Sequence, residues 1–111
     1  ETVLRLSKIP NIIGIKESSN QLIERTIFYQ KECGEQLDVF SGDDLPGIDA
    51  VAKGARGVIS VTANVAPSLM HQACHFARQE HFSEAYKIHQ TLLPLHETLF
   101  VETNPIPVKW A

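Results

Sequence analysis

The sequence contains few cysteines, no excess of positive charge and no long apolar segment. Cys33 and Cys74 lie far apart and neither belongs to a Cys-x-x-Cys pair, so we expect two free thiols rather than a disulfide. Thirteen acidic residues against ten basic ones give a net charge of −3, which argues against a nucleic-acid partner. No apolar run approaches the roughly 18 to 20 residues that cross a bilayer. The amino-terminal residues contain neither a methionine nor a signal-peptide core. We therefore expect a cytoplasmic protein with no membrane partner.

Several catalytic and binding motifs are also missing. No Gly-x-Ser-x-Gly sequence occurs, so a serine hydrolase has no support. The segment 54–57 is glycine-rich, but it leads into a strand rather than a helix, which is wrong for a phosphate-binding loop. His71 and His75 have the spacing of a helical zinc site, but Gln72 stands where a metalloprotease has glutamate, and we expect no bound metal. The other histidines are predicted on the surface or on helix faces: His81, His89 and His96.

The 111 residues suffice for one small domain with a modest core, and 43% of them are hydrophobic. No linker, low-complexity segment or short repeat divides them. Residues 2–6 have the character of the end of a helix, and residues 105–111 that of the beginning of another. We expect this chain to be a piece of a longer protein.

Three short apolar segments predict strands, and helical stretches separate them. The strands are expected at Asn11–Lys16, Leu37–Ser41 and Gly57–Val61. Each is almost continuously apolar, which is typical of parallel strands covered on both faces. The resulting βαβαβ order predicts an α/β fold, and the pattern leaves open whether the sheet is doubly wound or part of a (β/α)8 barrel.

Four helices are predicted around these strands. They are expected at 21–33, 46–53, 67–79 and from Phe82 to beyond Pro94. In the first, Leu22, Ile23, Ile27 and Phe28 form an apolar side, and Gly34 is suited to end the helix. Pro94 should bend the last helix, because proline removes a backbone donor and crowds the preceding turn.

The residues at the strand ends carry the chemistry of interest. In a barrel, the carboxyl ends of the strands meet at one mouth, which would bring Lys16 together with residues 41–44 and 59–64. An ammonium that loses hydration at such a position becomes a neutral amine that condenses with a ketone as a Schiff base. Lysine at a strand end is also commonly a solvated side chain, so this pattern alone leaves both interpretations open.

Each neighbouring residue has a structural alternative. Asp43 and Asp44 precede a helix, where a carboxylate caps free backbone N–H groups. Gly42 permits either a tight turn or the close approach of a ligand to the backbone. The hydroxyl and amide side chains in 60–64 could equally serve their own turn.

Four blocks of sequence resemble one enzyme family. They are Asn11–Glu17, Ser41–Asp44, Gly57–Val65 and Asn104–Lys109. Together they are similar to the 4-hydroxy-tetrahydrodipicolinate (dihydrodipicolinate) synthases, which belong to the pyruvate-dependent class I aldolases and lyases. The Gly-Ile-Lys block is shared by the wider group, whereas the blocks around Thr62 and Asn104 point to the synthases.

The resemblance implies a (β/α)8 barrel followed by a helical carboxyl-terminal region. The three strands would be the sixth to eighth of the barrel, with residues 1–80 forming its last three βα units and residues 81–111 beginning the helical region. Lys16 would form a Schiff base with pyruvate, and the resulting enamine would attack aspartate semialdehyde in lysine and diaminopimelate biosynthesis. No metal or organic cofactor is implied, and the full-length parent is expected to be a homotetramer.

The resemblance also assigns roles near Lys16. The backbone carbonyl of Ile59 would help to hold pyruvate, Gly42 would form the floor of the pocket, and Asp43 could contact the second substrate. The first five βα units of such a barrel are absent from these residues. With them are absent the family's tyrosine relay, its carboxylate-binding threonines and its entrance arginine. Neither Tyr29 nor Tyr86 replaces that tyrosine, so we expect the isolated chain to be inactive.

Two other functions fit the same residues. An N-acetylneuraminate lyase or a keto-deoxy-sugar aldolase would also use Lys16, but these relatives usually carry a different loop at 60–64. A non-catalytic assembly module is the alternative from another class. An isolated three-stranded piece leaves open sheet edges and apolar faces, so we expect it to associate with itself.

Overall fold

The computed structural model describes all 111 residues, and helices alternate with strands over most of their length. The helices are α1 (Thr2–Leu6), α2 (Leu22–Cys33), α3 (Gly47–Ala52), α4 (Pro67–Arg78), α5 (Phe82–Thr98) and α6 (Ile106–Trp110). The strands are β1 (Gly14–Glu17), β2 (Asp38–Ser41) and β3 (Gly57–Val58). Two 3-10 turns complete the fold, η1 (Gly34–Gln36) and η2 (Thr62–Asn64).

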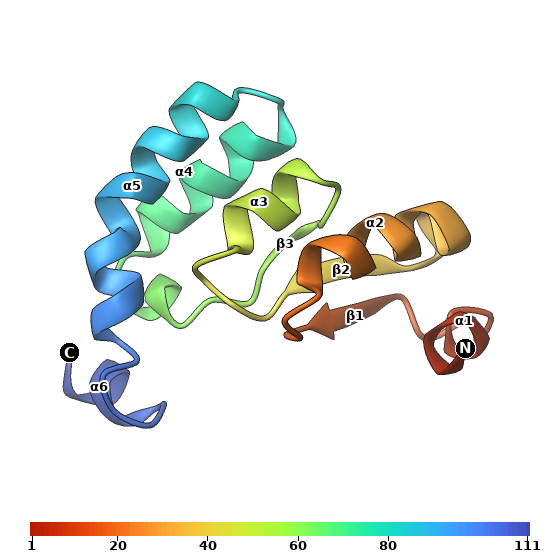
Figure 1. The fold of residues 1–111 in the computed structure, drawn as a ribbon, viewed down its shortest axis with the longest axis horizontal. Helices are drawn as coiled ribbons and strands as arrows, with labels where there is room; N and C mark the ends of the chain where they lie inside the picture. Colours follow the sequence, from red (N-terminus) through yellow and green to blue (C-terminus); the bar gives the residue numbers. More distant parts are fainter.

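The strands form one parallel sheet in the order β1-β2-β3, in which Lys16 pairs with Phe40 and Phe40 pairs with Gly57. Helices α2 and α3 connect successive strands and lie on the same side of the sheet (Figure 1). A doubly wound sheet would place helices on both sides. Consecutive neighbouring strands with helices on one side are instead three successive βα units of a (β/α)8 barrel.

The two faces of the sheet differ in burial. Val39 and Ser41 point toward the helices and are fully buried, since each is 0% exposed. The opposite face carries Lys16 and Ile59, which are exposed because no other segment of this chain covers that face. The expectation of strands covered on both faces is therefore wrong for these residues.

Two strand boundaries differ from the sequence-based expectation. β1 begins at Gly14 rather than Asn11, because the backbone N–H of Ile12 donates to the Ile9 carbonyl at 3.0 Å and keeps this segment in a turn. β3 ends at Val58 rather than Val61. The Ile59 N–H still donates to the Ser41 carbonyl of β2 at 2.8 Å, but the N–H groups of Val61 and Thr62 donate to the Asp44 carboxylate instead of the sheet. The four longer helices lie within a residue or two of their expected positions.

The core lies between α2, α3, α4 and α5 and is rich in alanine, which allows the helices to approach closely. Its members are Leu22, Ile48, Ala50, Val51, Ala55, Ala73, Ala77 and Ala85. On α2 the buried residues are Leu22, Thr26, Tyr29 and Cys33. The expected apolar side is wrong at Ile27 and Phe28, which are 49% and 45% exposed. Cys33 and Cys74 are both free, as predicted.

Helix α5 runs unbroken through Pro94 and packs along α4, and its axis curves along its length (Figure 1). Its side chains also reach α3, where the Tyr86 hydroxyl donates to Asp49. The division into a barrel piece (1–80) and a helical region (81–111) stays a prediction. None of the helices has the combination of length and hydropathy that a membrane span requires.

Candidate active site

Lys16 is the third residue of β1, and its side chain projects from the open face of the sheet. It lines a cavity of about 590 Å³ at the carboxyl ends of the strands. The other lining residues come from the loops after β1, β2 and β3, from the residues just after α5, and from the segment around α6. They include Ser18, Gly42, Asp43, Ile59, Ser60, Phe100, Asn104 and Lys109. The structure thus brings together the residues that the sequence places at the strand ends.

Gly42 lies directly against the Lys16 side chain. A Cβ atom at position 42 would lie 2.6 Å from Cε of Lys16 and 1.8 Å from Oγ of Ser18. Both distances are far below van der Waals contact, so any side chain here would displace its neighbours. The groups that approach Gly42 are the Lys16 and Ser18 side chains, and the approach of a ligand to its backbone stays a prediction.

Asp43 and Asp44 follow Gly42 and behave differently. Asp43 is half-buried, lines the Lys16 cavity, and makes no side-chain hydrogen bond. Asp44 is buried, and its Oδ2 accepts the backbone N–H groups of Val61 at 3.1 Å and Thr62 at 3.0 Å. The expected capping of α3 is wrong, because that helix has no side-chain cap. The Asp44 carboxylate instead caps backbone N–H groups in the turn after β3.

The turn after β3 uses its own polar side chains, as the structural alternative predicts. Ser60 Oγ accepts the backbone N–H of Ala63 at 2.8 Å, and Asn64 Nδ2 donates to the Val61 carbonyl at 3.0 Å. Thr62 is the exception, because its Oγ1 lies 2.7 Å from Nδ1 of His96 on α5. This turn carries Ile59 to the edge of the Lys16 cavity.

The environment of Lys16 differs from the expectation of a buried amine. Its side chain is exposed, whereas the adjacent Glu17 is 6% exposed and faces α2. The Glu17 carboxylate accepts the Ser19 backbone N–H at 2.8 Å and lies 3.3 Å from the Arg25 guanidinium. Burial alone would raise the pKa of Glu17, but these hydrogen bonds outweigh it and lower that pKa. The expectation for Lys16 is wrong because the three strands of this chain leave its side of the sheet open.

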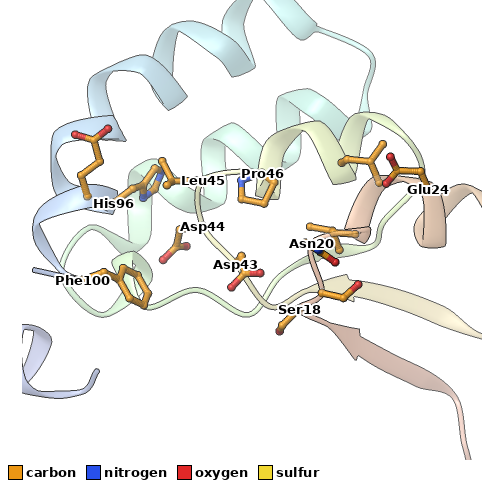
Figure 2. A pocket seen from close by; sticks show the side chains of 13 residues that line it. Ser18, Asn20, Glu24, Asp43, Asp44, Leu45, Pro46, His96 and Phe100 are labelled. Carbon is orange, nitrogen blue, oxygen red and sulfur yellow. The ribbon is translucent and has the colours of Figure 1, made fainter. Parts of the chain in front are cut away.

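A second cavity, of about 630 Å³, lies beside the first, and Asp43 and Phe100 line both. Figure 2 shows Asp43 and Asp44 on one loop, with His96 and Phe100 approaching from α5 and the residues after it. His96 is 1% exposed, and burial lowers its pKa. His89 is 8% exposed, so of the two predicted locations for these histidines the surface is wrong, and both lie on the buried face of α5.

Phe100 lines the Lys16 cavity, although no sequence motif points to it. Asn104 and Lys109 also line it, and the sequence indicates them only through the resemblance carried by the block 104–109. The buried histidines also had a signal: the residues buried along α5 and just after it recur at alternating steps of three and four. They are Ala85, His89, Leu92, His96 and Leu99.

The histidine pair on α4 does not join a larger ligand set. The rings of His71 and His75 stack with their centroids 5.9 Å apart, and both side chains are exposed. No group of three or more histidine, cysteine, aspartate or glutamate side chains in the structure is arranged to hold a metal ion.

The whole sequence, residues 1–111, matches the model of the dihydrodipicolinate synthetase family. The chain belongs to this family. Among curated relatives, it is 52% identical to the 4-hydroxy-tetrahydrodipicolinate synthase of Legionella pneumophila and 51% identical to that of Shigella dysenteriae, each over all 111 residues. The chain spans 38% of the length of these relatives.

Solved structures of the family agree in fold. The dihydrodipicolinate synthase of Acinetobacter baumannii, solved in complex with pyruvate, superposes with a TM-score of 0.92 at 39% identity. It covers 98% of this chain, which corresponds to 37% of that protein. The synthase of Aquifex aeolicus gives a TM-score of 0.92 at 40% identity, over 97% of this chain and 37% of its own length. The βαβαβ arrangement with α4 and α5 is therefore that of a dihydrodipicolinate synthase segment.

Proposed function

We propose that Lys16 is the Schiff-base lysine of a 4-hydroxy-tetrahydrodipicolinate synthase, which condenses pyruvate with aspartate semialdehyde in lysine and diaminopimelate biosynthesis. The observation that carries this proposal is the shared cavity of Lys16, Gly42 and Ile59 at the carboxyl ends of three parallel strands. Family membership and the pyruvate complex of the Acinetobacter relative support it.

The chemistry follows from the amine. Attack of a neutral lysine amine on the ketone of pyruvate, with loss of water, gives a protonated imine that withdraws electrons from the neighbouring methyl carbon. Loss of a methyl proton then gives an enamine, whose carbon forms a bond with the aldehyde carbon of the second substrate. In this proposal the Ile59 carbonyl and Gly42 position pyruvate, and Asp43 faces the second substrate.

The cavity contains a second amine, which provides a matched control. Lys16 and Lys109 both line it, but they come from different elements, one from β1 and the other from α6. In a full-length protein that contains these residues, borohydride reduction with pyruvate should attach one pyruvate to Lys16 and none to Lys109. Lys16→Arg should abolish the adduct and the activity, whereas Lys109→Arg should retain the adduct.

The second substrate is tested separately. Once the Lys16 adduct is established, aspartate semialdehyde and N-acetylneuraminate are compared as substrates of the same preparation. Turnover of aspartate semialdehyde supports the synthase, whereas cleavage of N-acetylneuraminate would replace it with the lyase. An intact fold without any pyruvate adduct would favour the assembly module. The cytoplasmic setting and the tetramer stay predictions.

A further inference from the structure

Three buried polar side chains connect α5 to the loops around the Lys16 cavity. Asp44, Thr62 and His96 are 4%, 0% and 1% exposed. Asp44 Oδ2 accepts the Thr62 backbone N–H at 3.0 Å, and Thr62 Oγ1 lies 2.7 Å from His96 Nδ1. We call these three residues the buried linkage.

Attaching α5 through the buried linkage costs more free energy than attaching it through apolar contacts. Oδ1 of Asp44 and Nε2 of His96 are buried without a hydrogen-bond partner in the protein, which costs free energy that an apolar contact would not. Leucine at position 96 would continue the apolar stripe of α5, where Leu92 and Leu99 are already buried. Hydrogen bonds fix the direction and the distance between the groups that they join, whereas apolar packing does not.

Each member of the linkage adjoins a wall of the Lys16 cavity. Asp44 follows Asp43, Thr62 follows Val61, and His96 precedes Phe100 by one helical turn; Asp43, Val61 and Phe100 all line the cavity. These walls come from the loop after β2, the turn after β3 and the end of α5. The cavity therefore depends on three segments that the linkage joins.

We propose that Thr62 and His96, with Asp44, are positioning residues that hold these three walls in register for pyruvate and the second substrate. This rests on the proposed function of Lys16. In this proposal the linkage touches no substrate and acts through Asp43, Val61 and Phe100, which line the cavity.

The test uses a matched pair of buried threonines in the full-length protein. Thr62 and Thr26 are both 0% exposed, but the Thr26 hydroxyl has no hydrogen-bond partner. At a temperature where circular dichroism shows each variant to be folded, Thr62→Val should lower kcat/KM by about tenfold or more, because small displacements of binding groups are costly. Most of this loss should appear as a higher KM for pyruvate. Thr62→Ser should restore most of it, and Thr26→Val should leave kcat/KM unchanged.

A second pair covers the possibility that Thr62→Val does not fold. His96→Asn keeps an amide near the position of Nδ1, whereas His96→Leu keeps the volume without a polar group. We expect His96→Leu to raise KM and His96→Asn to restore it in part. His75→Leu is the control, since His75 is exposed on α4. His89 is unsuitable because its ring centroid lies 5.3 Å from that of His96. The double variant Thr62→Val/His96→Leu should lose no more kcat/KM than either single variant. Both substitutions remove the same hydrogen bond, between Thr62 Oγ1 and His96 Nδ1.

The outcomes separate the two proposals. An adduct at Lys16 with equal KM values for Thr62→Val, Thr62→Ser and wild type would overturn the positioning role and leave the Schiff base intact. Fully additive losses in the double variant would overturn it as well. Absence of any pyruvate adduct in the wild type would overturn both.

Discussion

Gly42 is the residue whose size the proposed site depends on most directly. Its missing side chain leaves room for Cε of Lys16 and Oγ of Ser18, both within 2.6 Å of where a Cβ would lie. Gly42→Ala must therefore move Lys16 or the loop, and in the full-length protein we expect pyruvate trapping at Lys16 to fall by about a hundredfold. Gly57→Ala is the control, since its Cβ would meet Phe40 at an ordinary 3.9 Å. Equal trapping by the two variants would contradict this role of Gly42.

We expect His89 and His96 to make the stability of the protein depend on pH. Burial lowers the pKa of each below the ordinary 6.5, although the charge of Asp44 opposes the shift at both residues. The unfolded chain therefore binds more protons near and below pH 6.5, so this contribution is complete above that pH and is lost as the pH falls. We expect the urea midpoint to drop between about pH 7.5 and pH 5.

The variant His89→Leu should make the drop in the urea midpoint at low pH smaller, because it removes one of the two buried histidines. His75→Gln is the control, since His75 is exposed on α4. The pH dependence would have another source if His89→Leu and His75→Gln changed the midpoint alike at every pH.

At the scale of elements, Tyr86 and Asp49 connect α5 to α3. The hydrogen bond to Asp49, followed by burial, raises the pKa of Tyr86 to about 12. Because the folded pKa exceeds the ordinary value of 10, this contribution is present below pH 10 and is lost as the pH rises toward 12. Tyr86→Phe should lower the free energy of unfolding at pH 7 by at most about 1 kcal/mol, since the pair is exposed.

A double-mutant cycle checks that the effect belongs to this pair. Asp49→Asn alone should weaken the same contact, and Tyr86→Phe combined with Asp49→Asn should destabilise by less than the sum. Strict additivity in urea unfolding would show that the two side chains stabilise the protein independently.

Local sequence predicts helices and strands well at positions where the residue type itself restricts the backbone conformation. Pro67 occupies the first position of α4, as its fixed φ favours, and the parallel strand order follows from apolar runs between helices. The end of β3 could not be predicted in this way. The N–H group of Val61 donates to the carboxylate of Asp44, which lies 17 residues earlier in the chain. The burial of His96 likewise depends on Thr62, 34 residues away. Such contacts become visible only when the segments meet.

At the scale of the molecule, one face of the sheet is open and several large apolar side chains are exposed. Ile13, Val101 and Trp110 are 74%, 72% and 90% exposed. The 111-residue chain alone should therefore self-associate, with a light-scattering mass that rises with concentration. Ile13→Ser with Trp110→Ser should reduce this association, and Gln72→Ser should not. A monomer at every concentration would contradict the expectation.

The candidate site is also a property of the whole molecule. Sequence places Lys16, Gly42, Asp43 and Ile59 at strand ends, and the parallel sheet brings them to one cavity. Their roles stay predictions. The exposure of Lys16 could not be read from the strand itself, because it depends on what covers the opposite face of the sheet.

The central claim is that the Lys16 amine captures pyruvate covalently. Its most direct test is peptide mass spectrometry of the full-length protein after borohydride reduction with pyruvate. We predict one reduced pyruvate on the peptide that contains Lys16 and none on the 111-residue chain treated alone, where that amine is exposed. A full-length protein that turns over pyruvate while Lys16 stays unmodified, or carries the adduct on Lys109, would contradict the account.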